Sequence, residues 1–274
     1  MAKTEVPDQS HQAKKRFGQN FLVDGNIINR IIRAVAPQSG QHLVEIGPGL
    51  GALTSHLIDK KCQLDVVEID RDLAEKLRAQ YGQANGFQLH LIDALKADFG
   101  SLTKPGAKLR IIGNLPYNIS TPLLFHLLTF KEKIADMHFM LQREVVDRMG
   151  SPEGKKTYGR LSIMVQYHCH VEPLFVVPPS AFKPAPKVES AIVRLRPRAR
   201  TIMAQDPAFF SRVVNVCFQQ RRKTIRNGLK SILKELPEDC LSHIDLSRRP
   251  ETFSVEEFVD IANALSALRR PGTE

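Results

Sequence analysis

The sequence of 274 residues predicts an α/β fold, in which a mostly parallel sheet flanked by helices is followed by a smaller all-helical region. Two observations lead to this prediction. Up to about residue 142, short apolar runs alternate with segments of helical spacing, and this alternation is typical of βαβ units. After about residue 200, apolar residues recur only at helical steps.

The apolar pattern places each element in chain order. Strands are expected at 42–46, 64–69, 87–92, 109–113 and 134–141. Helices are expected at 26–36, 51–59, 71–81, 120–130, 212–236 and 254–268. The last helix begins with Ser254 and Glu257, which form the pattern of a capping box. A polar stretch at 196–207 marks the border between a first domain at 13–200 and a helical domain at 201–274. We also expect residues 1–12 to form a mobile tail.

Composition excludes several classes of protein. The hydrophobic fraction of 42% is ordinary for a globular chain, and no apolar run approaches the length of a membrane span. The first residues are polar and contain no apolar core of a signal peptide. The four cysteines are scattered without metal-like spacing, so we expect neither a disulfide framework nor a metal site. A cytoplasmic protein fits these features, and nothing in the sequence demands more than a monomer.

The charge distribution points to a polyanionic partner. The formal net charge is +10, and the segment 183–230 carries twelve basic residues against two acidic ones, which accounts for the whole excess. Arg221, Arg222, Lys223 and Arg226 lie within six positions of the expected helix 212–236. On a helix, 222 and 226 would share a face and could hold RNA phosphates. The alternatives, a solvated basic face or ion pairing with acids elsewhere, stay open.

Residues at the ends of the first three expected strands suggest a nucleoside pocket. Gly47, Gly49 and Gly51 lie between the strand 42–46 and the helix after it, where glycines let the backbone approach a ligand. Glu68 ends the second strand, at the position where an acid commonly binds ribose hydroxyls. Asp93 follows the third strand and can accept a hydrogen bond from an adenine amino group.

Glu45 favours S-adenosylmethionine over NAD as the ligand of this pocket. A carboxylate beside the glycine loop would repel the pyrophosphate of NAD, but it would attract an ammonium and a sulfonium. Pro48 also changes the loop from the dinucleotide-binding form. In the alternative interpretation, Glu45 points to solvent and the glycines only form a tight turn.

The tetrad Asn114-Leu115-Pro116-Tyr117 follows the fourth expected strand, beside this pocket. Pro116 favours an extended Leu115, whose carbonyl is then presented together with the amide oxygen of Asn114. Two acceptors and the flat ring of Tyr117 suit the exocyclic amino group of a base that has left its stack. Adenine N6 develops positive charge as a methyl group arrives, so fixed acceptors stabilise the transition state. Alternatively, Asn114 caps the next helix and Tyr117 is a core ring.

The ordered motifs resemble those of the ribosomal RNA adenine N6,N6-dimethyltransferases, in particular the bacterial small-subunit (16S) members. The matching stretches span nearly the whole chain, at 14–24, 44–54, 66–73, 92–99, 112–125, 141–149, 156–166, 178–195 and 219–229. The resemblance implies a Rossmann-like S-adenosylmethionine-dependent methyltransferase sheet with a helical C-terminal rRNA-binding domain. It also implies a product of two adjacent dimethyladenosines in a hairpin loop near the 3′ end of 16S rRNA, made on the small (30S) subunit or its precursor.

The resemblance also assigns roles to individual residues. It implies that Asn20 and Leu22 contact the cofactor from the N-terminal segment and that Phe182 is a second ring that sandwiches the target base. The glycine loop, Glu68, Asp93 and the tetrad would take the roles described above. Three alternatives remain at this point: a 23S rRNA adenine N6-methyltransferase of the antibiotic-resistance type, a non-catalytic factor in small-subunit assembly, and an NAD-dependent oxidoreductase.

Overall fold

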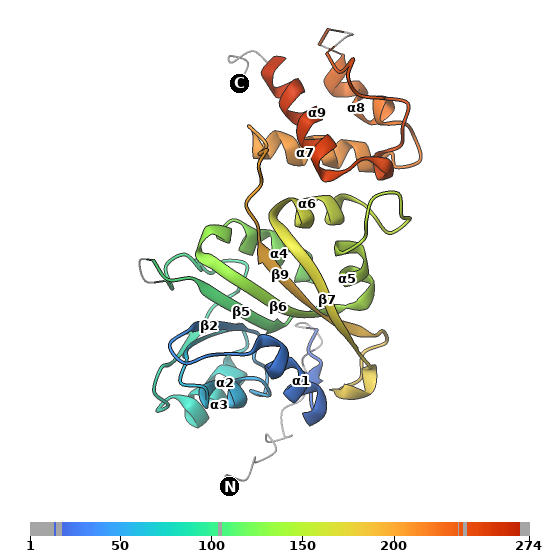
Figure 1. Ribbon diagram of the computed structural model, residues 1–274. Coiled ribbons are helices and arrows are strands. Elements are labelled where there is room, and N and C mark those ends of the chain that lie inside the picture. Colours follow the sequence, from blue (N-terminus) through green and yellow to red (C-terminus); the bar gives the residue numbers. More distant parts are fainter. Residues whose placement is uncertain (1–13, 15–17, 104–105, 235, 238–239, 269–274) are drawn as a thin grey trace. The chain divides into compact units, whose positions relative to one another are not determined.

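The computed structural model describes residues 14, 18–103, 106–234, 236–237 and 240–268 (Figure 1). The expected mobile tail at 1–12 lies outside the described residues. The chain forms two compact units, of which the first contains Met1–Val146 with Glu172–Pro197 and the second contains Asp147–Val171 with Arg198–Glu274. None of the helices among the described residues combines the length and the apolar character that a membrane span requires.

Strands and helices alternate through most of the first unit, and helices make up most of the second unit. The strands are β1 (Phe21–Leu22), β2 (His42–Ile46), β3 (Gln63–Glu68), β4 (Phe87–Leu91), β5 (Leu109–Asn114), β6 (Ile134–Gln142), β7 (Cys169–Val177), β8 (Phe182–Lys183) and β9 (Ser190–Pro197). The helices are α1 (Gly25–Val35), α2 (Thr54–Ile58), α3 (Arg71–Tyr81), α4 (Ser120–Leu128), α5 (Arg143–Met149), α6 (Arg160–His168), α7 (Pro207–Gln219), α8 (Ile225–Leu233) and α9 (Val255–Leu268).

The main sheet has seven strands in the order β4-β3-β2-β5-β6-β9-β7. β4, β3, β2, β5 and β6 pair in parallel, whereas β9 pairs with β6 in the antiparallel direction. The order reverses at β2, because the chain first moves outward to β4 and then returns to add β5 on the other side. Ligands of such sheets bind at the carboxyl ends of the strands beside this reversal.

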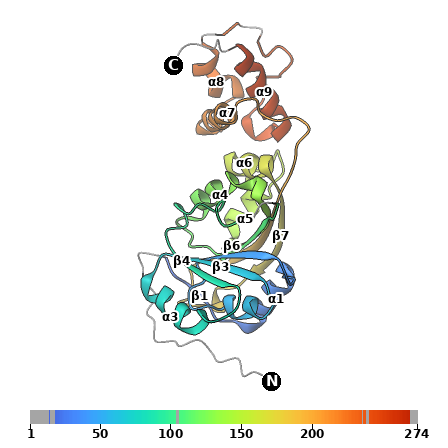
Figure 2. The same ribbon diagram turned by 90° about the vertical axis from the view of Figure 1, so that its left-hand side faces the viewer.

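Helices cover both faces of this sheet, with α1, α2 and α3 on one face and α4 on the other (Figures 1 and 2). Helix α1 shows how the sequence determines this packing. Asp24 caps its first turn by accepting hydrogen bonds from the backbone N–H groups of Asn26 and Ile27. Its buried side chains then recur at helical spacing, at Ile28, Ile31, Ile32 and Val35, and join the core beneath the sheet.

The parallel α/β prediction is confirmed, and the five expected strands are present within one or two residues of the expected bounds. The capping box of α9 is also confirmed, because Ser254 and Glu257 exchange backbone-to-side-chain hydrogen bonds of 2.8 and 3.0 Å. Strands β1, β7, β8 and β9 were not expected from the sequence. β9 and β7 extend the main sheet beyond β6, whereas β1 and β8 pair with each other, and β9 carries a residue that matters for the site below.

The expected helix 212–236 is wrong, because the structure has two helices, α7 and α8, joined by a turn at 220–224. The reason is a close approach between the two helices. A Cβ atom on Gly228 of α8 would lie 2.8 Å from the Cα atom of Cys217 in α7. The two helices therefore fold back on one another, and burial of their apolar faces outweighs helical continuity across the turn.

The compact units differ from the expected border at residue 200 in one respect. The second unit takes up residues 147–171 from the middle of the chain, because α6 packs against α7 and α9. The apolar residues of α6 are buried by helices that follow it much later in the sequence, and local patterns carry no signal of that contact.

Candidate active site

A pocket of about 290 Å³ opens at the carboxyl ends of β2, β3, β4 and β5, within the first unit. Its lining includes the glycine loop, Glu45, Glu68, Asp93 and the tetrad 114–117, which come from four different strand ends. The structure therefore brings together the residues that the sequence predicted for one nucleoside pocket. Asn20 and Leu22 of the N-terminal segment line the same pocket.

The glycine loop needs glycine at two of its lining positions. Gly47 and Gly49 have φ angles of +65° and +60°, which side chains of L-residues rarely adopt. A Cβ on Gly49 would also lie 3.0 Å from the ring of Phe21 in β1. The loop thus lies directly against the N-terminal segment, and Phe21 itself lines the pocket.

Glu45 is 1% exposed and lines the pocket, so the alternative in which it points to solvent is excluded. The hydroxyl of Thr54, at the start of α2, donates a hydrogen bond of 2.6 Å to its carboxylate. Burial raises the pKa of Glu45 to about 7, the hydrogen bond from Thr54 lowers it, and the nearby charge of Glu68 raises it. A cation in the pocket would favour the ionised form of this carboxylate.

Glu68 and Asp93 lie at the ends of neighbouring strands. Burial raises the pKa of Glu68, while hydrogen bonds from the backbone N–H groups of Asp70, Ile69 and Gly49 lower it. An ionised carboxylate offers about four acceptor sites, so these backbone donors still leave capacity for a ligand hydroxyl. Asp93 is partly exposed, and one of its oxygens accepts a hydrogen bond of 2.9 Å from the N–H of Leu95.

The N-terminal segment is held over the pocket by an acidic residue that the sequence did not single out. Asp70, which is 1% exposed, accepts a hydrogen bond of 3.1 Å from Gln19 and forms an ion pair of 2.6 Å with Lys14. On the other side, β1 pairs with β8, with Leu22 opposite Phe182. These contacts place Asn20 and Leu22 beside the pocket.

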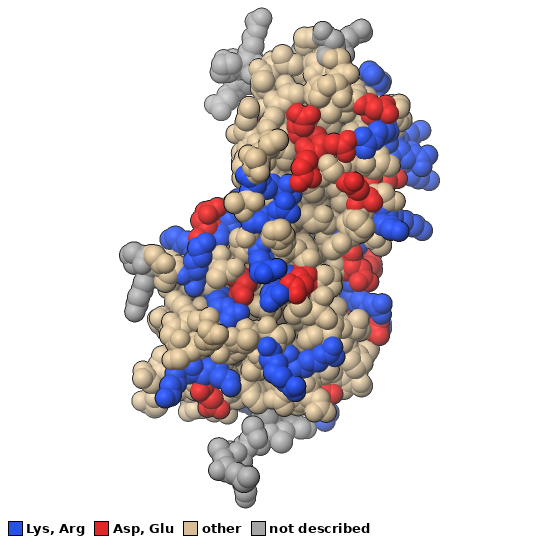
Figure 3. Space-filling model, viewed as in Figure 1, with Lys and Arg blue, Asp and Glu red and all other residues tan. Residues whose placement is uncertain are grey.

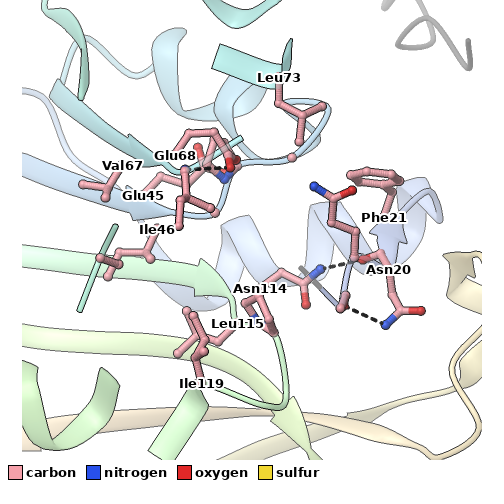
Figure 4. A pocket seen from close by; sticks show the side chains of 18 of the residues that line it. Asn20, Phe21, Glu45, Ile46, Val67, Glu68, Leu73, Asn114, Leu115 and Ile119 are labelled. Carbon is pink, nitrogen blue, oxygen red and sulfur yellow. Dashed lines mark hydrogen bonds between the residues drawn. The ribbon is translucent and has the colours of Figure 1, made fainter. Parts of the chain in front are cut away.

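Asn114 ends β5, and its amide faces the N-terminal segment across the pocket (Figure 4). Its Nδ2 group donates a hydrogen bond of 3.0 Å to the backbone carbonyl of Asn20. This bond fixes the orientation of the amide, and Oδ1 accepts no hydrogen bond from the residues that the structure describes. The amide oxygen is therefore available to a ligand. The alternative role of Asn114 as a helix cap is excluded, because Ile119 occupies the N-cap position of α4.

The rest of the tetrad continues past the end of the strand. Leu115 is 1% exposed, and its N–H donates to the carbonyl of Met140 at 3.2 Å, which extends the β5–β6 ladder by one residue. Tyr117 lines the pocket and is half-buried. Its hydroxyl lies 2.7 Å from the Oγ atom of Ser190 in β9. Sequence reasoning missed Ser190 and Thr54. Each contacts a pocket residue of another element, Tyr117 and Glu45 respectively, and local patterns carry no signal of such contacts.

The expectation that Phe182 sandwiches the target base is not met in this structure. Phe182 is 3% exposed and belongs to the hydrophobic core, together with Leu22 and Ala181. It is not among the residues that line the pocket. A ring that is 3% exposed offers no surface to a base, so in this structure Phe182 packs in the core.

The four basic residues predicted to bind RNA do not share a helix face. Arg221, Arg222 and Lys223 lie in the turn between α7 and α8, and only Arg226 is in α8. Arg221 is engaged, because its guanidinium donates to the carbonyl of Lys155 and lies 3.9 Å from Glu251. Arg222, Lys223 and Arg226 are exposed, and their side chains make no ion pair with any residue that the structure describes.

The sheet order, the glycine loop and the acids at the ends of β2, β3 and β4 define an α/β enzyme of the methyltransferase class. The model of the family described as "Ribosomal RNA adenine dimethylase" matches residues 10–267. The chain belongs to this family.

Relatives and solved structures agree with this assignment. The "Ribosomal RNA small subunit methyltransferase A" of Saccharophagus degradans is 55% identical, over 96% of this chain and 98% of its own length. A dimethyladenosine transferase from Plasmodium falciparum is 27% identical, with a TM-score of 0.75 over 88% of this chain and 95% of its own. The 23S rRNA methyltransferase ErmE is 26% identical, with a TM-score of 0.68 over 90% of this chain and its whole length.

Proposed function

We propose that this enzyme dimethylates N6 of two adjacent adenosines in a hairpin loop near the 3′ end of 16S rRNA, with S-adenosylmethionine as methyl donor. The small ribosomal subunit or its precursor is the substrate in this proposal, which places the enzyme in the cytoplasm and gives it a part in subunit biogenesis. The observation that carries the chemistry is the amide of Asn114, whose Oδ1 atom accepts no hydrogen bond from a described residue and lies at the edge of a pocket that contains buried acids.

The pocket fits S-adenosylmethionine by its donor set. Glu45 supplies a buried carboxylate for the positively charged methionine part, and the glycine loop leaves room beside it. Glu68 offers acceptor sites to the ribose hydroxyls, and Asp93 can accept from the adenine amino group. When bound, the cofactor supplies a methyl group on a sulfonium, which is already a good leaving group.

The tetrad supports methylation at an exocyclic amine. The amide oxygen of Asn114 and the carbonyl of Leu115 can accept the two N–H bonds of adenine N6, and Tyr117 supplies a ring for stacking. As N6 attacks, its hydrogens become more positive, so these fixed acceptors bind the transition state more strongly than the ground state. All the residues involved come from one chain, so the proposal needs no second copy.

The exposed basic residues of the second unit support the RNA substrate. Arg222, Lys223 and Arg226 are exposed and unpaired among the described residues, and Figure 3 shows basic side chains grouped on the surface of this unit. We assign them to rRNA phosphates, which position the particle without reading its sequence. Arg221 stabilises the turn rather than contacting RNA, because its guanidinium already donates a hydrogen bond to the backbone carbonyl of Lys155.

Methyl transfer to purified particles tests the proposal. Undermethylated 30S subunits, 50S subunits and labelled S-adenosylmethionine are combined with the enzyme, with Asn114→Ala as the control variant. The expected result is incorporation into 30S alone, recovered as N6,N6-dimethyladenosine at two adjacent positions and lost in the variant. Transfer to 50S instead would support the large-subunit alternative that the likeness to ErmE represents. Rescue of subunit assembly by the inactive variant would show that the binding role is the essential one.

A further inference from the structure

The hydroxyl of Tyr117 is not required for stacking on a base, because a phenylalanine ring offers the same flat face. The structure nevertheless gives this hydroxyl a defined partner, Ser190 Oγ at 2.7 Å. Ser190 is 0% exposed and stands at the first residue of β9. We propose that Ser190 is a positioning residue for the target base, which acts by fixing the ring of Tyr117; the inference rests on the proposed role of Tyr117 in holding that base.

The sheet places Ser190 where it can reach the tetrad. β9 pairs with β6, with Ser190 opposite Gln142, and β6 pairs with β5, whose last residue is Asn114. The chain that follows β5 therefore crosses the end of β6 before the Tyr117 hydroxyl reaches β9. Ser190 is the first residue of β9, which runs antiparallel to β6, so it lies at the end of the sheet where the parallel strands finish and the pocket opens. This placement explains why an antiparallel strand that lines no part of the pocket still affects its geometry.

The backbone around Ser190 is firmly held. Its neighbour Glu189 accepts a hydrogen bond of 3.0 Å from the N–H of Arg143 and forms an ion pair of 2.8 Å with the Arg143 side chain. These contacts tie the start of β9 to the point where β6 leads into α5. The Ser190 hydroxyl is attached to this firmly held backbone and fixes the hydroxyl end of the Tyr117 ring. The other end of the ring is fixed by the backbone of the tetrad. The carbonyl of Tyr117 also accepts a hydrogen bond of 3.1 Å from Ser120.

Loss of the Ser190 hydroxyl would remove the hydrogen bond that holds the Tyr117 ring, so the ring could adopt other orientations. The ring would then stack on the base in a broader set of orientations, and fewer of them would place N6 against the acceptors of Asn114 and Leu115. Misplacement of a reacting group lowers the rate without removing any group that takes part in the chemistry. The cofactor side of the pocket does not include Ser190, so cofactor affinity should not change.

The test compares Ser190→Ala, Ser190→Thr, Tyr117→Phe, Tyr117→Ala and the double variant Ser190→Ala/Tyr117→Phe in methyl transfer to undermethylated 30S subunits. We expect Ser190→Ala and Tyr117→Phe each to lower kcat/KM for the particle by about threefold to tenfold, with an unchanged Kd for S-adenosylmethionine. The double variant should be no worse than either single variant, because both remove the same bond. Ser190→Thr, which keeps a hydroxyl, should restore most of the activity.

Ser162→Ala serves as the matched control, because Ser162 is also 0% exposed and hydrogen-bonded but lies in the second unit. Melting temperatures of all variants show whether stability alone accounts for a loss. Multiplicative losses in the double variant, or normal kinetics of Ser190→Ala, would overturn the inference. Full activity of Tyr117→Ala would instead overturn the proposed role of the tyrosine, so the two failures are distinguishable.

Discussion

The pocket of the first unit and the basic turn of the second unit hold their charged groups in opposite ways. Glu45 and Glu68 are 1% and 5% exposed, and each has a fixed hydrogen-bond partner. Arg222 and Lys223 are exposed, and neither is ion-paired with a described residue. In a buried site each group is strongly coupled to its neighbours, whereas exposed charges are screened by salt and act additively. Substitutions in the pocket should therefore have large individual effects, and those in the turn small cumulative ones.

The largest expected effect is that of Asn114→Ala on the chemical step. Removing one fixed group that stabilises developing charge commonly lowers kcat by about 10²-fold to 10³-fold. Cofactor affinity should fall far less, because Glu45, Glu68 and Asp93 remain in the pocket. Single-turnover methyl transfer, together with calorimetric measurement of cofactor binding, checks both. An equal loss of cofactor affinity and rate would mean that Asn114 mainly binds the cofactor.

The glycine loop gives the next effect, and its two glycines form a matched pair. Alanine at Gly47 or Gly49 adopts a left-handed conformation that costs about 1–2 kcal/mol. At Gly49 the added Cβ would also meet the Phe21 ring at 3.0 Å, whereas at Gly47 its nearest neighbour is a backbone oxygen at 3.8 Å. Gly49→Ala should therefore lose about 1 kcal/mol more stability than Gly47→Ala. Urea denaturation without cofactor measures the difference, and equal losses would show that Phe21 yields freely.

Glu45→Gln should weaken cofactor binding by about tenfold, because a charge-assisted contact is roughly twice as strong as a neutral one. The substitution keeps the shape of the side chain and its acceptor for Thr54, so a large loss of stability is not expected. An unchanged Kd would show that the carboxylate does not face the cation. Thr54→Val, which removes the hydrogen bond and keeps the charge, is the matched variant.

The raised pKa of Glu45 makes this contact dependent on pH. Since the pKa is about 7, the ionised fraction grows by about fivefold between pH 6 and pH 7, and the association constant of a cationic cofactor should grow with it. The folded protein holds this proton more tightly than the unfolded chain. The contribution of Glu45 to stability therefore declines as the pH rises from its ordinary pKa of 4.5 to about 7. A pH profile as steep in Glu45→Gln as in the unaltered protein would contradict the assignment.

Most of the pocket could be predicted from the sequence because its residues stand at the ends of locally encoded strands. The run 42–46 is apolar apart from Glu45 and His42, and it forms β2 with the expected bounds. Four strands were not expected, and two of them, β1 and β8, are only two residues long, too short to give a periodic signal. β7 contains Pro173, which argues against a central strand, and the structure places β7 at the edge of the sheet, where proline is tolerated.

The residues that sequence reasoning missed act through contacts between distant segments. Ser190 reaches Tyr117 from β9, and Asp70 holds Lys14 and Gln19 across more than fifty positions. The break in the expected helix 212–236 has the same origin, because it depends on the approach of Gly228 to Cys217. Local periodicity describes which face of an element is buried, but it does not say which element covers that face.

The smallest expected effects belong to the basic turn, and they sharpen the comparison with the pocket. Arg222→Ala and Lys223→Ala should each weaken binding of the small subunit by a few-fold and lower the slope of log K against log salt by just under one. Arg221→Ala should change the slope less, because the guanidinium of Arg221 is hydrogen-bonded to the backbone carbonyl of Lys155 and lies near Glu251. Lys60→Ala, an exposed lysine between α2 and β3, is the control. If Arg221→Ala and Arg222→Ala changed the slope equally, the partners of Arg221 would not keep it from contacting RNA, and the contrast between paired and unpaired charges would fail in the turn.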